Sequence, residues 1–521
     1  MHKFINIVKT IFKPTYIYPI LFSLFPILAL YNFNIEYVHY TAILRSIKIT
    51  LIVVILLLIL ANLLLRDHAR AAIVVTYVVF LFFIYGHIFS YIDERWPNLI
   101  QNRLFTGIWI LLIILGGWWL VKKFTKIEAA TRFLTVVSVV LFGISLFNSI
   151  AFEVQKARTN LASRAQVTAQ IGEQLSVDPD EVPDIYFIIL DAHTRSDVLL
   201  DEFGYDNSDF IRELEEMGFF VGECSQTNYW RTDYSLTSSL NLDYLQNFLD
   251  DPNLLPDWKY SVVRQTLEAL GYTTVAFESR ATHNIDLGVD VLLSRRAKSF
   301  IYEDIYPFTN LNDFEVQLIK TTWLQSWLQL IANFDDKLPE DMIIDAENAA
   351  YLEHYRQTLY ILDELQRVPY MESPKFVMAH LLLPHEPFVF TPDGRYEYHH
   401  TDDEFEIGYR NNAEFIDSHL GEVLANIIAR SSVPPVIIVM GDHGPNGTPP
   451  EMLLPILNAY YIPNAAEDDF YDRITPVNSF RVVFNAHFST DYEILEDLSY
   501  YATGAEFADY ELVPVTCPGE K

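Results

Sequence analysis

Long apolar runs fill the first part of the chain, and short polar stretches separate them. A helix needs about 20 mostly apolar residues to cross a bilayer. Five runs meet this requirement: Tyr16–Phe33, Ser46–Leu65, Ala71–Ile92, Leu104–Val121 and Phe133–Phe152. Five runs in succession disfavour buried core helices, and the first lacks the small-residue cleavage site of a signal peptide. The pattern predicts about five transmembrane helices over residues 1–152.

The hydrophobic pattern changes after a polar linker at residues 153–183, which reads as a helical or loose stalk. Beyond it, short β-rich runs alternate with helical periodicity, which is typical of a mostly parallel sheet covered by helices on both faces. The predicted strands are Asp184–Leu190, Tyr272–Phe277, Lys375–Leu382 and Pro435–Met440, with Pro455–Ile462 added at an edge. The clearest predicted helices are Ser235–Leu249, Ala346–Gln366 and Glu414–Ala429. We therefore expect one α/β domain over residues 184–515.

The charge of the chain divides at the same place as its hydropathy. Residues 1–152 hold 13 Lys and Arg against 5 Asp and Glu, whereas the rest of the chain has a net charge of −40. A surface this acidic repels phosphate backbones and excludes nucleic-acid binding. Two cysteines, Cys224 and Cys517, rule out a disulfide scaffold, and the sequence leaves open whether they pair.

The basic residues between the spans predict how the chain is inserted. With the N-terminus in the cytoplasm, nine Lys and Arg face the cytoplasm and seven face the other side. An odd number of spans then places residues 153–521 outside. The sequence thus predicts a multi-pass protein of the cell membrane with an extracytoplasmic α/β domain.

Metal-type side chains follow three of the predicted strands. Asp191 follows the first, Asp442 and His443 follow the fourth, and His380 and His385 lie at the end of the third. Ligands of open α/β sheets bind beyond the carboxyl ends of the strands, so these side chains should converge. An aspartate after a strand is also a common helix cap or turn residue, and a single histidine is more often structural. Three strand ends together favour a divalent-ion site.

A hydroxyl-rich segment that opens a predicted helix offers a group for such an ion to activate. Thr232 stands just before its first turn, where free N–H groups favour an anion. On residue type alone, a Ser or Thr helix cap is the favoured explanation of Thr232. Ser235 and Thr237 are weaker candidates for a nucleophile.

These motifs in this order resemble the alkaline phosphatase/sulfatase superfamily over residues 183–490. They are Asp191 after a strand, Thr232 with Ser235 at a helix start, His385 in Pro-His-Glu-Pro-Phe, and Asp442-His443 between glycines. With the spans in front, the chain looks like the membrane-anchored branch, which includes lipoteichoic acid synthases and phosphoethanolamine transferases. The resemblance implies a three-layer α/β/α domain with a mostly parallel central sheet.

The resemblance also implies roles for individual residues. Asp191, Asp442, His443 and the Thr232 hydroxyl would bind a divalent ion, with Mn, Mg, Zn and Ca not distinguished and a second ion left open. Thr232 would be the nucleophile, and His385, with His380 less firmly, would contact the transferred group. Arg280 and His283, which follow the second predicted strand, are further candidates for lining the anion pocket.

The predicted function is that of a membrane-anchored transferase or hydrolase of phosphate or sulfate esters, with a covalent threonine intermediate and a donor carried by a membrane lipid. One alternative is a sulfatase, whose motif has a Cys or Ser that is oxidised to formylglycine. The segment that begins at Cys224 lacks the Pro and Arg of that motif, which favours Thr232. The other alternative is an inactive membrane receptor or scaffold with the same fold.

Overall fold

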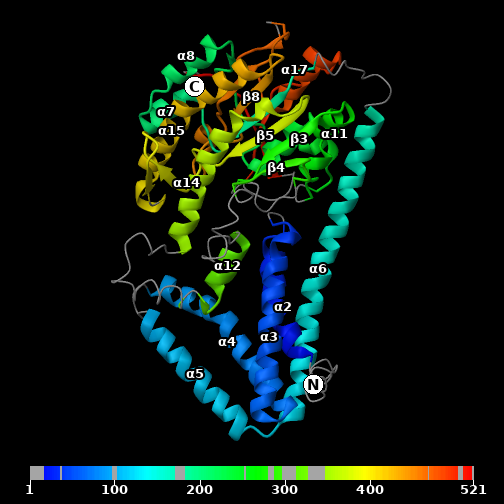
Figure 1. Cartoon of the computed structure of the whole chain (residues 1–521), viewed down its shortest axis with the longest axis vertical. Helices are drawn as coiled ribbons and strands as arrows, with labels where there is room; N and C mark the ends of the chain where they lie inside the picture. The colour runs from blue at the N-terminus through cyan, green and yellow to red at the C-terminus, as the bar shows by residue number, and fades with distance from the viewer. Residues whose placement is uncertain are drawn as a thin grey trace. The chain divides into compact units, whose positions relative to one another are not determined.

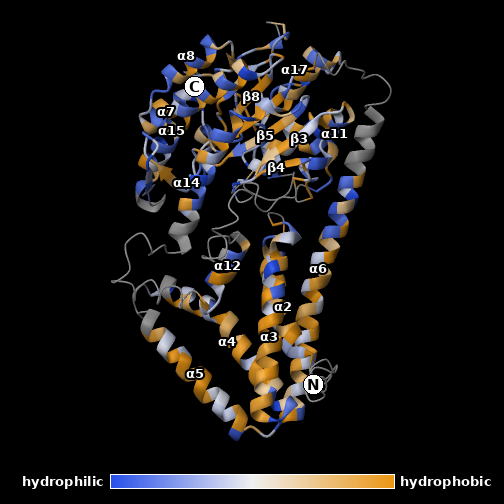
Figure 2. Cartoon of the chain, in the orientation of Figure 1, coloured by the Kyte–Doolittle hydropathy of each residue, from blue (hydrophilic) through white to orange (hydrophobic). Residues whose placement is uncertain are grey.

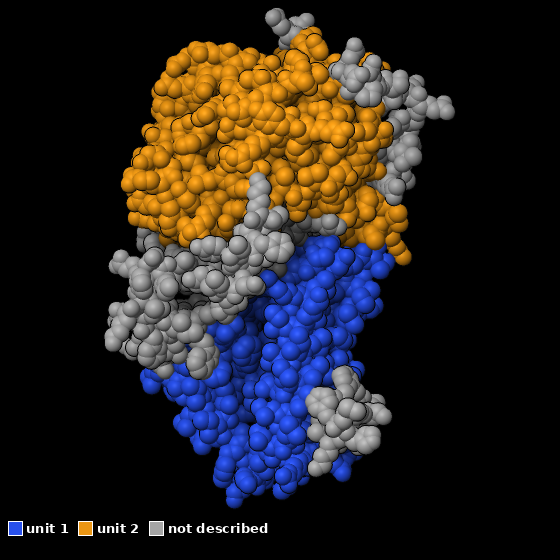
Figure 3. All heavy atoms as spheres, viewed as in Figure 1, with its two compact units in different colours: residues 1–154, 307–349 blue, residues 155–306, 350–521 orange. Residues whose placement is uncertain are grey.

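The computed structural model describes residues 17–35, 38–96, 102–170, 182–251, 254–279, 287–295, 313–324, 326, 346–399, 401–466, 469–502 and 509–518. The chain divides into two compact units (Figure 3). A helical unit comprises residues 1–154 and 307–349, and an α/β unit comprises residues 155–306 and 350–521. The helical unit thus includes a stretch that is inserted between two parts of the α/β unit in the sequence.

The helical unit is built from apolar helices, whose hydrophobic residues are visible in Figure 2. They are α2 (Tyr18–Phe33), α3 (Leu44–Leu65), α4 (His68–Arg95), α5 (Asn102–Lys122) and α6 (Ile127–Gln170), with the short helix η2 (Tyr40–Ile43) before α3 and α12 (Asp313–Thr321) from the inserted stretch. Large apolar side chains on α3, α5 and α6, such as Leu56, Ile114 and Phe147, are more than half exposed. Such surfaces are suited to lipid.

Four of these helices, not five, are long and apolar enough to span a membrane among the described residues. The prediction of five spans was wrong at Tyr16–Phe33. Helix α2 has 16 residues there. At 1.5 Å per residue it is about 24 Å long, which is shorter than the hydrocarbon core of about 30 Å. Helix α6 continues to Gln170, into the predicted linker.

The α/β unit contains a seven-stranded sheet in the order β2-β9-β8-β1-β5-β3-β4. Its strands are β1 (Ile185–Leu190), β2 (Phe220–Val221), β3 (Thr273–Phe277), β4 (Val291–Leu293), β5 (Lys375–Leu381), β8 (Val436–Gly441) and β9 (Asn458–Tyr461). Strands β8, β1, β5, β3 and β4 pair in parallel, and β9 is antiparallel to both its neighbours. The predicted parallel sheet is confirmed. The predicted edge strand is β9, which is covered by β2 and so is not at the edge.

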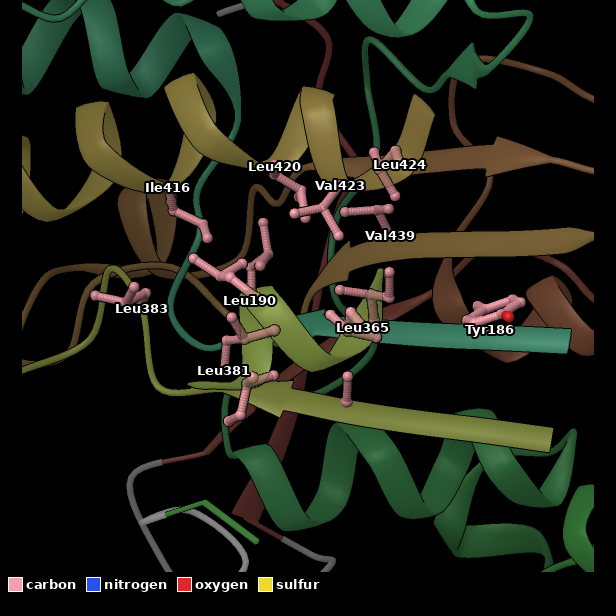
Figure 4. Close-up of a cluster of buried hydrophobic side chains, with 14 of the residues drawn as sticks. Tyr186, Leu190, Leu365, Leu381, Leu383, Ile416, Leu420, Val423, Leu424 and Val439 are labelled. Carbon is pink, nitrogen blue, oxygen red and sulfur yellow. The ribbon is translucent and has the colours of Figure 1, made fainter. Parts of the chain in front are cut away.

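Helices pack on both faces of this sheet (Figure 1). Helices α9 (Thr232–Asn241), α11 (Val262–Ala269) and α17 (Pro476–Phe488) contribute to one core, and α8 (Ser208–Glu216), α14 (Ala346–Leu365) and α15 (Thr401–Arg430) contribute to the other. Strand β1 is fully buried and sends alternate side chains into each core: Phe187 and Ile189 into the first, Tyr186 and Leu190 into the second (Figure 4). This burial explains the continuous apolar run in its sequence. The predicted three-layer arrangement is confirmed.

The remaining elements are short. The helices are α7 (Ser196–Phe203), α10 (Leu245–Phe248), η3 (Trp258–Tyr260), η6 (Val368–Tyr370) and α16 (Pro450–Leu453), and two hairpins are formed by β6 (Phe388–Phe390) with β7 (Tyr396–His399) and by β10 (Ser499–Ala502) with β11 (Tyr510–Val513). The predicted helix Ser235–Leu249 is two helices, because Leu242 adopts a left-handed conformation that ends α9.

Candidate metal centre

Two adjacent strands of the sheet carry the candidate metal ligands. Strands β1 and β8 are paired so that Leu190 lies opposite Gly441. Asp191 and the Asp442-His443 pair follow these positions directly, so parallel pairing brings them together. His443 Nε2 is 3.6 Å from Asp191 Oδ1 and 3.6 Å from Asp442 Oδ2. One ligand atom from each of the three buried residues lies within 4.8 Å of the other two.

Among the described residues, two carboxylate oxygens that face the cluster have no hydrogen-bond partner. Asp191 Oδ1 and Asp442 Oδ2 are buried and accept no hydrogen bond from the described residues. The other oxygen of Asp442 accepts from the backbone N–H groups of Ala192 and His443, each at 3.0 Å. His443 Nδ1 donates to the carbonyl oxygen of Gly444 at 2.6 Å, which leaves the Nε2 lone pair directed at the cluster. Unpaired buried carboxylate oxygens are costly, and a cation would satisfy both.

The electrostatics of the cluster also favour a positive charge at its centre. Burial by itself raises the pKa of Asp191, but the nearby imidazoles of His385 and His380 outweigh it and hold that pKa below its usual range. For His443, burial opposes protonation, yet the carboxylates of Asp442 and Asp191 raise its pKa above the ordinary value. A proton or a divalent ion would each neutralise part of the negative charge here.

Thr232 reaches this cluster from helix α9, of which it is the first residue. Its Oγ1 is 3.1 Å from His443 Nε2. The Ser235 hydroxyl is buried and has a different partner: it accepts a hydrogen bond from Thr227 Oγ1 at 2.9 Å. Of these two hydroxyls, the structure therefore brings the Thr232 hydroxyl into hydrogen-bonding contact with the cluster.

His380 and His385 both contact Asp191, in different ways. His380 lies within β5, is buried, and its Nε2 is 3.0 Å from Asp191 Oδ2. The backbone N–H of His385 donates to the Asp191 carbonyl oxygen at 3.0 Å. The His385 ring lies 6.3 Å from the His443 ring, measured between centroids. His380 is thus placed to orient Asp191, whereas His385 borders the cluster.

Two groups near the centre were missed by the sequence analysis. Asn446 donates through Nδ2 to His385 Nε2 at 2.7 Å, and its only signal was its place three residues after His443. His193 is fully buried and its Nε2 is 2.8 Å from Asp417 Oδ1, far away in the sequence. No local pattern marks that second pair.

Two predicted residues lie outside the described residues. They are Arg280 and His283, which follow β3 and were expected to line an anion pocket. Their predicted role stays a prediction.

We expect His380→Ala to weaken metal binding by about 10- to 100-fold, because the hydrogen bond that orients Asp191 is lost. His380→Gln, which retains a donor, should recover part of the affinity. Isothermal titration calorimetry with Zn²⁺ or Mn²⁺ measures the change. His419→Ala is the control, because His419 is an exposed histidine on α15. Equal affinity for the His380→Ala and His419→Ala variants would contradict the orienting role.

Comparisons with known proteins differ between sequence and structure. No family model and no curated protein matches the sequence. Among solved structures, the chain is similar to the C-terminal periplasmic domain of EcEptC from Escherichia coli in complex with Zn, at 12% identity over 65% of this chain and 94% of that chain, with a TM-score of 0.41.

It is also similar to the lipoteichoic acid synthase LtaP from Listeria monocytogenes, at 13% identity over 68% of this chain and 92% of that chain, with a TM-score of 0.38. A third similar structure is the integral membrane protein lipooligosaccharide phosphoethanolamine transferase A (EptA) from Neisseria meningitidis, at 12% identity. That match covers 85% of this chain and 88% of the other, with a TM-score of 0.35.

Proposed function

We propose that this protein is a membrane-anchored, metal-dependent enzyme that transfers or hydrolyses phosphate esters through a covalent intermediate on Thr232. The observation that carries the proposal is the contact of Thr232 Oγ1 with His443, beside the unpaired oxygens of Asp191 and Asp442. A structural helix cap would have no need of a buried cluster of two carboxylates and an imidazole.

The cluster suits a divalent ion of intermediate hardness. Asp191, Asp442 and His443 offer two carboxylate oxygens and one imidazole nitrogen, with the Thr232 hydroxyl as a further ligand. A bound divalent ion lowers the pKa of a coordinated hydroxyl and neutralises charge on a phosphoryl oxygen. The identity of the ion and the presence of a second one are left to metal analysis.

The reaction then has two displacement steps. In the first, Thr232 Oγ1 gives its proton to solvent and bonds to phosphorus as the bond to the leaving oxygen breaks. His385, at the border of the cluster, contacts the transferred group, and the leaving oxygen takes up a proton from water. In the second, an acceptor hydroxyl or water gives its proton to solvent and bonds to phosphorus, the bond to Thr232 Oγ1 breaks, and Thr232 Oγ1 takes up a proton from solvent. The N-terminus of α9 favours the anionic group throughout.

The disulfide between Cys224 and Cys517 supports two further parts of the proposal. Disulfides persist in oxidising compartments, so this one favours an α/β unit outside the cytoplasm. This argument for the location of the α/β unit does not depend on the number of membrane crossings. The disulfide also occupies the Cys224 sulfur, so the sulfatase alternative loses its formylglycine candidate. With membrane helices in the same chain, we infer a lipid-linked donor.

Intact-mass analysis tests this function directly. The full-length protein, loaded with Zn²⁺ or Mn²⁺ in detergent, is incubated with a membrane lipid extract. We expect a mass increase equal to a phosphoryl or substituted phosphoryl group, absent when EDTA is added. A protein that gains no mass but cleaves sulfate esters would support the sulfatase. A metal-loaded protein without either activity would support the receptor or scaffold.

A further inference from the structure

The stretch inserted between β4 and α14 contains a segment that packs inside the helical unit. The described part of the stretch begins with α12 and continues to Ser326. Helix α12 contacts α4, α2 and η2 (Figure 1). A loop of an α/β domain ordinarily runs over the surface of its own domain, so this packing needs a separate explanation.

The first half of the segment fills a position among the apolar helices. Phe314 is 1% exposed and belongs to a cluster with Ile27, Tyr31 and Ile43, and Leu318 packs against the same cluster. Next to Phe314, the buried carboxylate of Glu315 binds the guanidinium of Arg45 through two nitrogens, one of them Nε at 2.6 Å. A buried carboxylate is stable only when it is paired, so this ion pair fixes the segment at one place on the bundle.

The second half of the segment lies against the middle of α4. The Trp323 backbone N–H donates to the carbonyl oxygen of Phe82 at 2.9 Å, and Ser326 Oγ donates to the Tyr85 hydroxyl. Phe82 and Tyr85 both lie inside the candidate span His68–Ile92. Phe82 is ten residues from the end of that span, which is about 15 Å along the helix. Irregular backbone at such a depth is tolerated where protein satisfies its polar groups, and these two hydrogen bonds satisfy one group each of Trp323 and Ser326.

A glycine on α4 allows this close approach. A Cβ atom at Gly86 would overlap the carbonyl oxygen of Lys320 and come within 2.7 Å of the Thr321 Cα. Small residues let backbones approach in this way at membrane-helix contacts. By contrast, a Cβ at Gly107 on α5 would meet nothing within 4 Å. The absence of a side chain at Gly86 therefore leaves room for the inserted segment, and Gly107 provides a matched control.

We propose that the segment formed by residues 313–324 and 326 is a re-entrant membrane anchor. This anchor packs against α2, η2 and α4 and holds the α/β unit to the bundle independently of α6. The inference goes beyond the proposed function and stands whether or not the metal centre is catalytic.

A cleavable form of the full-length chain tests the anchor. A protease site is placed between residues 171 and 181, and membranes that carry the protein are cleaved and washed with high salt. Cys224 and Cys517 both lie in the released fragment, so the disulfide does not tether it. We expect the fragment to stay with the membranes in the parent and in Gly107→Leu, and to enter the supernatant about tenfold more in Gly86→Leu. Release from the parent, or equal retention in the two glycine variants, would overturn the proposal.

Charge reversal provides a test that does not disturb the glycine contact. Arg45→Glu and Glu315→Arg alone should each release about tenfold more fragment, and the double variant should restore retention. Release from the double variant equal to that from the single variants would show that the pair does not hold the segment. Retention in all three would have the same meaning.

Discussion

Thr232→Ala is expected to lower turnover by about 10⁴-fold or more and to abolish the mass increase seen after exposure to membrane lipids. The Thr232 hydroxyl is in contact with His443, whereas the Ser235 hydroxyl is bonded to Thr227. The loss should appear in kcat, because the side chain forms a bond in the reaction rather than only binding substrate. Single-turnover kinetics and intact-mass analysis measure the two effects.

Two further variants distinguish a nucleophile from a helix cap. Thr232→Ser retains a hydroxyl and should retain measurable turnover and the mass increase. Thr237→Ala is the matched control, because Thr237 is a fully buried threonine of the same helix with no assigned contact to the cluster. A Thr232→Ala variant that still gains the full mass would refute the covalent intermediate on Thr232.

Asp442→Asn is expected to remove the bound metal. Asp442 Oδ2 faces the cluster without a partner, and an amide there either loses the negative charge or turns a donor toward the ion. The parent should gain about 2.7 kcal/mol of stability at a free metal concentration of 100 times Kd, whereas the variant should gain almost none. Elemental analysis of the purified protein and thermal unfolding with and without Zn²⁺ or Mn²⁺ test the prediction.

A comparison of Asp442→Asn with the parent, both without metal, separates an effect on metal binding from an effect on folding. Asp442→Asn keeps a side-chain oxygen that can accept from the Ala192 and His443 N–H groups, so the metal-free variant should still unfold cooperatively. Asp393→Asn serves as the control, because Asp393 is exposed and paired only locally with Arg395 and Thr391. If the metal stabilises Asp442→Asn as much as it stabilises Asp393→Asn, Asp442 is not a metal ligand.

The sequence predicted five of the seven strands of the sheet and most of the candidate cluster, because their signals are local. Parallel strands covered on both faces must be continuously apolar, so a polar residue that ends such a run stands out, as Asp191 and Asp442 do. The convergence of these residues followed from a general property of parallel sheets, which place their carboxyl ends at one edge. The first apolar run was misjudged, because hydropathy does not show that α2 is only 16 residues long.

The nature of the contacts at the site could not be predicted from residue types. The sequence assigned His380 and His385 the same kind of role, with His385 preferred, and only the fold decides that His380 bonds the Asp191 side chain and that His385 contacts Asn446. The same holds for Cys224 and Cys517, which are 293 residues apart and form a disulfide. Contacts of this kind depend on side-chain direction and on which loops meet, and neither leaves a periodic signal.

The sequence by itself determined that apolar membrane-type helices precede an α/β sheet with carboxylates and imidazoles at its strand ends, since each of these features is set by local hydrophobic period and residue type. Only the tertiary structure decided that the Thr232 hydroxyl meets His443, that two buried carboxylate oxygens are left unpaired beside it, and that residues 313–324 and 326 return to the helical unit. These three facts join segments that are tens to hundreds of residues apart, and the packing of the whole chain sets such distances.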